Sequence, residues 1–105
     1  MHWLIPLIII SAQVTAYNPV PEQTDSTPCY TASNYNLCEA LDRGELICAY
    51  NQVPLHTMIY IKDLGFCRVE DRTSPTYRNR VDVAMQDHDD AINWGIRTRD
   101  VYLLK

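Results

Sequence analysis

The sequence predicts a mainly β protein, a small six-stranded β-barrel with one short helix near its C-terminus. Three observations lead to this fold class. Short runs of β-branched and aromatic residues recur along the chain, and turn-forming residues separate them. One segment late in the chain carries helix-capping residues instead of an alternating pattern. The chain shows no internal repeat, so the strands are expected to close on one another as one barrel.

The first third of the chain is expected to contribute one strand and a long loop. Residues 14–17 alternate and are rich in β-forming residues, which predicts a first strand. Residues 18–28 contain three prolines together with Asp, Ser and Thr, which is typical of a loop. Residues 30–37 are polar and aromatic, and we expect further loop or a loose hairpin there.

Three strands are expected in the middle of the chain, at residues 46–50, 58–61 and 66–71. Turn-forming residues lie between each pair. The third strand alternates strictly, and successive side chains of a strand point to opposite faces. The alternation therefore predicts two faces, one formed by Cys67, Val69 and Asp71 and the other by Phe66, Arg68 and Glu70.

A strand, a capped helix and a closing strand are expected at the end of the chain. Residues 80–85 form the strand, and Asp87 then suits the N-cap position with Asp90 three residues on. Gly95 is a natural stop where a left-handed residue is needed. The closing strand is expected at residues 100–104. The helix is expected to bury Ala91, Ile92 and Trp94.

Length and charge limit the class of protein. A chain of 105 residues forms one domain, and 47% hydrophobic residues is normal for a globular fold and too high for disorder. The formal net charge is −4, and no run of Lys or Arg occurs. Neither a nucleic acid nor an anionic membrane surface is therefore expected as a partner.

Residues 1–12 resemble a short hydrophobic leader. The apolar run from Trp3 to Ile10 is far shorter than the ~20 residues that span a bilayer, so no stable membrane span is expected. Small residues, Ser11 and Ala12, follow the run, as in a secretory signal, although no Lys or Arg precedes it. We expect a secreted protein with its domain at residues 13–105. The alternatives are a truncated start or an added hydrophobic strand packed on the domain.

Four cysteines in so short a chain favour an oxidising compartment. Cys29 and Cys38 flank a polar loop and are expected to pair. Cys48 and Cys67 lie in strand-like runs and are either bridged or small core residues. The spacings contain no Cys-x-x-Cys pair, so a zinc site is not expected.

Asp71 and Asp82 are the strongest candidates for chemistry. They lie eleven residues apart, each beside β-branched strand residues. Carboxylates that strands hold rigidly are groups that proteins use for acid/base chemistry on sugars. The alternative is structural, because a buried carboxylate also accepts backbone N–H bonds or pairs with arginines such as Arg72 and Arg80.

Four segments of the chain resemble one known family, namely residues 55–61, 65–71, 79–83 and 88–95. Their order and spacing are similar to the 3D domain, a double-psi β-barrel module named for three aspartates. That domain is found in the membrane-bound lytic transglycosylase A family and in many secreted cell-wall proteins. The resemblance covers residues 13–104, which is nearly all of the chain outside the leader.

The resemblance implies a double-psi barrel that acts on the glycan strands of bacterial peptidoglycan. It implies that Asp82 is the acid/base of a lytic transglycosylase and that Asp71 lines the same groove. Such an enzyme needs no metal and no cofactor, and none is expected here. Contacts to the sugar are expected from Asn79, Arg80, Tyr77 and Arg72. We expect the protein to act as a monomer.

Two alternatives to the enzyme remain open. The loop after Asp71 lacks the glycines that the family usually has there, which favours a barrel that binds peptidoglycan without cutting it. A disulfide-stapled module that binds a protein partner is the third reading, and a large exposed apolar patch would point to it. Tyrosines could line a glycan groove, but those within strands are expected to be half-buried barrel residues, namely Tyr17, Tyr60 and Tyr102.

Overall fold

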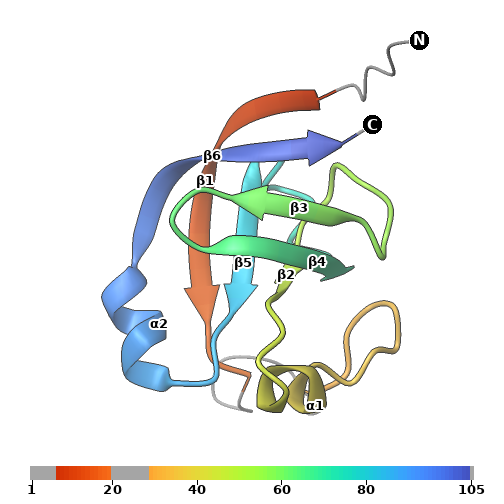
Figure 1. Ribbon diagram of the computed structural model, residues 1–105, viewed down its shortest axis with the longest axis vertical. Helices are drawn as coiled ribbons and strands as arrows, with labels where there is room; N and C mark the ends of the chain where they lie inside the picture. Colours follow the sequence, from red (N-terminus) through yellow and green to blue (C-terminus); the bar gives the residue numbers. More distant parts are fainter. Residues whose placement is uncertain (1–6, 20–28, 105) are drawn as a thin grey trace, which may run out of the picture.

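The computed structural model describes residues 7–19 and 29–104, and within these ranges it is a closed β-barrel with two short helices. The strands follow one another around the barrel in the order β1-β5-β2-β4-β3-β6 (Figure 1). This confirms the mainly β fold class, the six-stranded barrel and the short helix near the C-terminus. The elements are β1 (Leu7–Tyr17), α1 (Leu37–Asp42), β2 (Ile47–Ala49), β3 (Met58–Ile61), β4 (Gly65–Asp71), β5 (Arg80–Ala84), α2 (His88–Trp94) and β6 (Ile96–Leu104).

Small and β-branched side chains fill the inside of the barrel. Alternate residues of each strand point inward, as a period of two requires. On β5, Val81 and Val83 are inside, and Asp82 between them is therefore outside. The interior cluster also includes Ala12, Val14, Cys48, Tyr50, Ile59, Ile61, Cys67, Val69, Val101 and Leu103.

The first strand is longer than the sequence pattern predicted. It begins at Leu7, and nine of its eleven residues pair antiparallel with β6, from Leu7↔Leu104 to Thr15↔Ile96. The expected boundary at residue 14 was wrong because Leu7–Ile10 is uniformly apolar and shows no alternation. Residues 7–12 of the expected leader are therefore strand. Residues 1–6 and most of the proline-containing loop lie outside the described residues.

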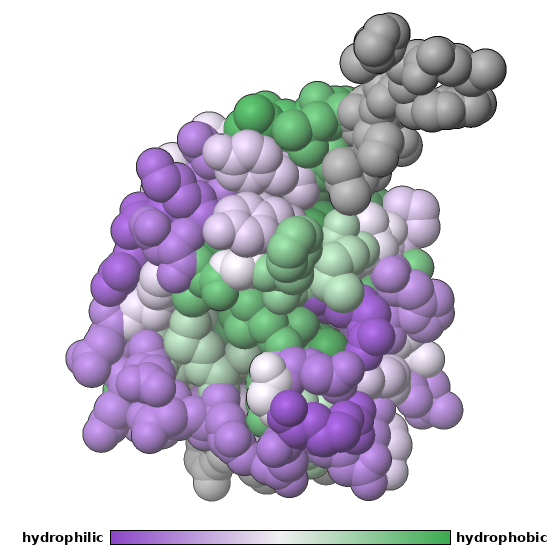
Figure 2. All heavy atoms as spheres, in the orientation of Figure 1, coloured by the Kyte–Doolittle hydropathy of each residue, from purple (hydrophilic) through white to green (hydrophobic). Residues whose placement is uncertain are grey.

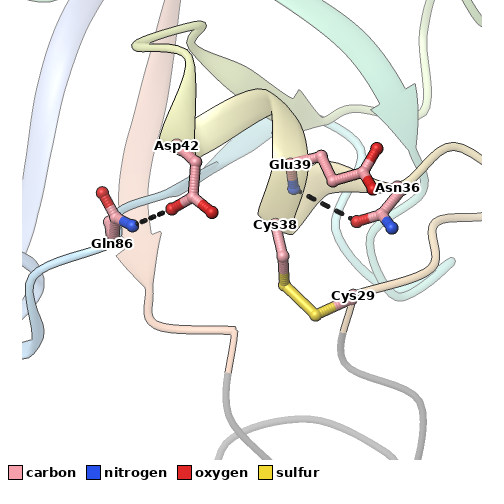
Figure 3. The surroundings of a disulfide bond; sticks show 6 residues. All are labelled: Cys29, Asn36, Cys38, Glu39, Asp42 and Gln86. Atoms are coloured by element: carbon pink, nitrogen blue, oxygen red, sulfur yellow. Dashed lines mark hydrogen bonds between the residues drawn. A yellow bond between two sulfur atoms is a disulfide. The ribbon is translucent and has the colours of Figure 1, made fainter.

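The helix α1 was not predicted, since only loop or a loose hairpin was expected around residue 37. Asn36 caps it by accepting a hydrogen bond from the Glu39 N–H, and Figure 3 shows this cap. Leu37 and Ala40 then pack outside the barrel on Ile47 of β2 and Ala84 of β5. A helix of six residues is too short to show a period, so the Asn36–Glu39 pair was its only signal.

Two disulfide bonds are present: the expected pair Cys29–Cys38, and Cys48–Cys67, which takes the bridged one of the two alternatives left open for these residues. Cys29–Cys38 closes the loop that leads into α1, and Cys48–Cys67 links β2 to β4 inside the barrel. Figure 3 shows the first bond beside the contact between Asp42 and Gln86, which ties α1 to the segment after β5. The loop between residues 29 and 37 is thus held at both ends.

Replacing both cysteines of that loop, Cys29→Ser with Cys38→Ser, is expected to lower the free energy of unfolding by about 2–3 kcal/mol. A bridge that closes a loop of about ten residues removes roughly this much chain entropy from the unfolded state. Urea unfolding of the parent and the double variant under non-reducing conditions measures the difference. An unchanged midpoint with an unchanged slope would contradict the expectation.

A β-bulge near the end of β4 overturns the predicted faces of that strand. The register between β2 and β4 shifts between Cys48 and Ala49, so that Ala49 aligns with Asp71 while Cys48 aligns with Val69. Val69 is inside the barrel, but the Asp71 carboxylate meets a loop outside it. Asp71 therefore does not share the inner face with Cys67 and Val69, because the extra residue of the bulge turns it outward.

The helix α2 matches its predicted cap and only part of its predicted buried stripe. The Asp87 carboxylate accepts the Asp90 N–H at 3.0 Å, and Gly95 has a φ of 64° at the C-terminal end. Ala91 and Trp94 are buried as expected. Ile92 is 61% exposed, so its expected burial was wrong, because a helix this short presents only one narrow stripe to β1.

Candidate functional site

The bulge brings the two candidate carboxylates to one face of the barrel. Ala49 of β2 is the register partner of Asp82 on one side and of Asp71 on the other. Thr15 of β1 is the partner of Asp82 on its far side. Four neighbouring strands thus carry one row of outward residues, Thr15, Asp82, Ala49 and Asp71. The two aspartates are two strand spacings apart, about 10 Å between Cα atoms, and Ala49 is their common register partner.

Asp82 is half-buried, and its carboxylate has one side-chain partner on the neighbouring strand. The Thr15 hydroxyl donates a hydrogen bond of 3.0 Å to Asp82 Oδ1. Burial raises the pKa of Asp82 above its ordinary value, and the negative charge of Asp71 adds to the rise. The Thr15 hydrogen bond and the positive charge of Arg80 act in the opposite direction. The net result is a carboxyl group that holds its proton more tightly than an exposed aspartate.

Asp71 is fixed by backbone donors. Its Oδ1 accepts the N–H of Ala32 at 3.0 Å and the N–H of Arg72 at 2.9 Å. Ala32 belongs to the disulfide-held loop, and the neighbouring Ser33 N–H donates to the Glu70 carbonyl at 3.2 Å. The loop therefore positions the Asp71 carboxylate, and the disulfide Cys29–Cys38 positions the loop.

Tyr17 is a member of this face that the sequence pattern assigned only to a half-buried barrel position. It lies two residues beyond Thr15 on β1 and packs beside α1. Burial raises its pKa, and the charges of Asp71 and Asp82 raise it further. Tyr17 is therefore a neutral phenol near both carboxylates. No motif marked it, since its nearness to Asp71 follows from the strand order and not from spacing in the chain.

Arg72 and the loop after it are built into the fold. The Arg72 guanidinium donates to the carbonyl oxygens of Tyr50 and Val53 at 2.6 and 2.7 Å. Asn51 holds the same loop from the other side, because its Oδ1 accepts the Thr73 N–H at 2.9 Å and its Nδ2 donates to the Ser74 carbonyl at 3.1 Å. Arg72 was expected to contact sugar, and its guanidinium is instead committed to two backbone carbonyls.

Tyr77, Arg80 and Asn79, the other expected sugar contacts, lie together beside β1. The Arg80 guanidinium stacks over the Tyr77 ring at 3.7 Å from its centroid and donates to Gln13 Oε1 at 3.0 Å. Asn79 donates from its side chain to the Ser11 carbonyl. All three line a groove of about 380 Å³. We define the carboxylate face as the row Thr15, Asp82, Ala49 and Asp71. Arg80 precedes Asp82 by two residues on β5, so the groove adjoins this face.

A larger hollow of about 980 Å³ adjoins this groove, since Arg78 and Asn79 line both. Its walls are mostly apolar and include Ile8, Ile10, Val53 and Leu103, with Arg78 at the rim. Neither candidate aspartate lines it. Within residues 7–19 and 29–104, no three His, Cys, Asp or Glu side chains are grouped as a metal would require.

A second carboxylate on β4, Glu70, was assigned to the face of Phe66 and Arg68, and it is buried, with 1% of its surface accessible. Both carboxylate oxygens of Glu70 contact His56 Nδ1, and the distance to Oε2 is 3.1 Å. Ser33 Oγ donates a hydrogen bond of 3.4 Å to the same Oε2. His56 has a φ of 76°, a conformation uncommon outside glycine. A cross-strand histidine and the covering loop thus provide the partners that a buried carboxylate requires.

The row Thr15, Asp82 and Asp71 predicts opposite effects of two substitutions on the pKa of Asp82. Thr15→Val removes a hydrogen bond that favours the charged carboxylate, so the pKa of Asp82 is expected to rise. Asp71→Asn removes a neighbouring negative charge, so this pKa is expected to fall. Titration of the Asp82 carboxyl carbon by NMR in the parent and both variants measures the shifts. Shifts of the same sign would contradict the geometry.

Comparison with known proteins adds no family to this description, since no family model and no curated protein matches the chain. The described residues include no helix that is both long and apolar enough to cross a membrane. The two disulfides are compatible with an oxidising compartment. What the chain does must therefore be argued from the carboxylate face itself.

Proposed function

We propose that this chain cleaves the glycan strands of peptidoglycan as a lytic transglycosylase, with Asp82 as the acid/base. The observation that carries the proposal is a half-buried aspartate, with a raised pKa, on the same outer face as a second carboxylate. A catalytic acid must hold its proton near the working pH, and burial next to a like charge is how carboxyl groups achieve this. The resemblance of residues 79–83 and 65–71 to the 3D domain supports the choice of polymer.

The proposed reaction uses one carboxyl group twice. Asp82 donates its proton to the oxygen of the bond between N-acetylmuramic acid and N-acetylglucosamine, and that bond breaks. The 6-hydroxyl of the muramic acid residue then attacks its own anomeric carbon and returns a proton to Asp82. A 1,6-anhydro end forms, and no water is consumed. The Asp71 carboxylate lies on the same face, and we propose that it helps to stabilise the positive charge that develops on the sugar.

The neighbouring side chains support binding of a sugar polymer along this face. Tyr77 and Arg80 form a stacked pair beside Asp82 and line an open groove, which suits a chain that enters and leaves at both ends. Tyr17 offers a neutral phenol, which both donates and accepts hydrogen bonds, near the two carboxylates. We propose these groups as the sugar contacts in place of Arg72.

A second candidate function is a barrel that binds peptidoglycan without cutting it. The hydrogen bonds of Arg72 to the carbonyls of Tyr50 and Val53 favour this candidate, because they occupy donors that were expected to contact sugar. Both candidates place the protein outside the cytoplasm, where its disulfides persist and peptidoglycan is accessible. In both, the protein acts as a monomer.

Incubation of the folded, oxidised protein with purified peptidoglycan separates the two candidates. The enzyme is expected to release soluble glycan fragments, whereas a binding module would only sediment with the insoluble wall. Release of fragments supports the proposal. Sedimentation without release overturns it and leaves the binding module. Neither release nor sedimentation, from protein shown to be folded by circular dichroism, would rule out both candidates.

A further inference from the structure

A row of exposed apolar side chains crosses the outside of the barrel on β1, β6, β3 and β4. The register pairs Ile9 with Tyr102, Tyr102 with Tyr60, and Tyr60 with Phe66. Phe66 is 64% exposed. Figure 2 shows apolar and aromatic side chains gathered on the face where β3 and β4 lie in front. We define the aromatic face as these four residues with two exposed neighbours, that is, Leu7, Ile9, Met58, Tyr60, Phe66 and Tyr102.

The rings of the aromatic face are fixed before any partner arrives. Tyr60 lies edge-to-face with Phe66, at 5.0 Å between centroids, and with Tyr102, at 5.8 Å. Such pairs are favourable in themselves, so the rings need little further ordering on binding. Together with Leu7 and Met58 they surround a depression of about 270 Å³. The aromatic face is therefore a rigid, shallow binding surface.

The aromatic face lies opposite the carboxylate face. In the closed order β1-β5-β2-β4-β3-β6, strand β3 is three strands from β5 in either direction. Tyr60 is at the centre of the aromatic face on β3, and Asp82 is on β5. A partner bound at Tyr60 therefore leaves the groove beside Asp82 open.

Size and charge decide which partner fits. A stable protein interface buries about 800 Å² and 20–30 residues on each side, which is far more than six side chains supply. A peptide strand cannot add to the sheet, since every strand of the described barrel has neighbours on both sides. None of the six residues carries a charge, so a charged ligand has no partner of opposite sign there, and only the ring faces could attract a cation. What remains is a small neutral unit with an apolar side and hydroxyl groups, which describes a sugar ring.

We propose that the aromatic face is a second glycan-binding surface, which holds the protein on one strand of the polymer while the carboxylate face acts on another. Apolar C–H groups of a sugar would pack on Tyr60 and Phe66, and the tyrosine hydroxyls would exchange hydrogen bonds with it. The choice of peptidoglycan as the polymer rests on the proposed function. Two sites on one molecule raise the effective concentration of polymer at each of them.

Binding to purified peptidoglycan, measured by sedimentation, tests the proposal with two variants. Tyr60→Ala with Phe66→Ala is expected to weaken binding about tenfold, because two ring contacts are lost. The matched control is Ile92→Ala, which removes an equally exposed apolar side chain from α2 and is expected to change nothing. Thermal unfolding of each variant establishes that it is folded. Release of soluble fragments from an excess of wall should persist in the double variant, since Asp82 is untouched.

Two results would overturn the proposal. Unchanged wall binding by the folded double variant would remove the aromatic face from glycan recognition, even if fragment release established the proposed function. A parent dimer that the double variant converts to monomers, with wall binding unchanged, would assign the face to a second copy of the chain; analytical ultracentrifugation gives this readout. Failure of the proposed function shows differently, as absence of fragment release by the parent chain itself, whether or not that chain sediments with the wall.

Discussion

Asp82→Asn is expected to lower the rate of peptidoglycan cleavage by about 10²–10⁴-fold while leaving the fold and wall binding intact. An amide of the same shape keeps the Thr15 contact but has no proton to donate to a glycosidic oxygen, and general acid/base catalysis is worth roughly this factor. Burial and the charge of Asp71 raise the pKa of Asp82, but an amide at this position has no acidic proton on which they could act. The rate of release of soluble glycan fragments from purified peptidoglycan measures the effect.

The matched control for this variant is Asp89→Asn. It makes the same chemical change on α2, outside the row formed by Thr15, Asp82, Ala49 and Asp71, and the Asp89 side chain is 89% exposed. The control is expected to cleave at the parent rate. A variant at Asp82 that released fragments as fast as the control would exclude Asp82 as the acid/base, whatever its pKa.

Trp94→Ala is expected to lower the free energy of unfolding by about 3–5 kcal/mol, the largest stability effect anticipated in this chain. Trp94 is 8% exposed, belongs to the interior cluster, and donates its indole N–H to the Val14 carbonyl at 2.9 Å. The substitution thus leaves a cavity where α2 packs on β1 and an unpaired carbonyl as well. Because small domains are stable by only about 5–15 kcal/mol, a substantial part of the total would be lost.

Urea unfolding of three variants separates the contribution of Trp94 packing to stability from that of its indole hydrogen bond. Trp94→Phe keeps most of the packing and removes the indole N–H, and is expected to cost about 1 kcal/mol. Ile92→Ala on the same helix is exposed and is expected to fall within about 0.5 kcal/mol of the parent. Equal destabilisation by Trp94→Ala and Ile92→Ala would contradict the packing of α2 described here.

The parts of the fold that sequence could predict are those with a local signal. Asp87 and Gly95 marked both ends of α2, since capping depends on neighbouring residues only. Residues 58–61 alternate or are β-branched, and β3 forms at these residues. Leu7–Ile10 lacked alternation, so the start of β1 was missed although its pairing with β6 is regular. No local pattern distinguishes such a run from a leader.

The candidate site was only partly predictable for the same physical reason. Asp71 and Asp82 could be selected from their types and their strand neighbours. Their common face could not be foreseen, because it depends on the bulge that shifts Ala49 from register with Glu70 to register with Asp71. Thr15 also escaped notice, since its contact with Asp82 requires the parallel pairing of β1 with β5, two strands far apart in sequence.

The chemistry of the released ends tests the central claim most directly. The folded parent protein would digest purified peptidoglycan in water enriched in ¹⁸O, and mass spectrometry would identify the soluble muropeptides. We expect 1,6-anhydro ends that carry no ¹⁸O, because the muramic 6-hydroxyl and not water attacks the anomeric carbon, and their absence from the Asp82→Asn digest. Reducing ends labelled with ¹⁸O would mean that water is the nucleophile, and they would contradict the lytic-transglycosylase account even with Asp82 essential.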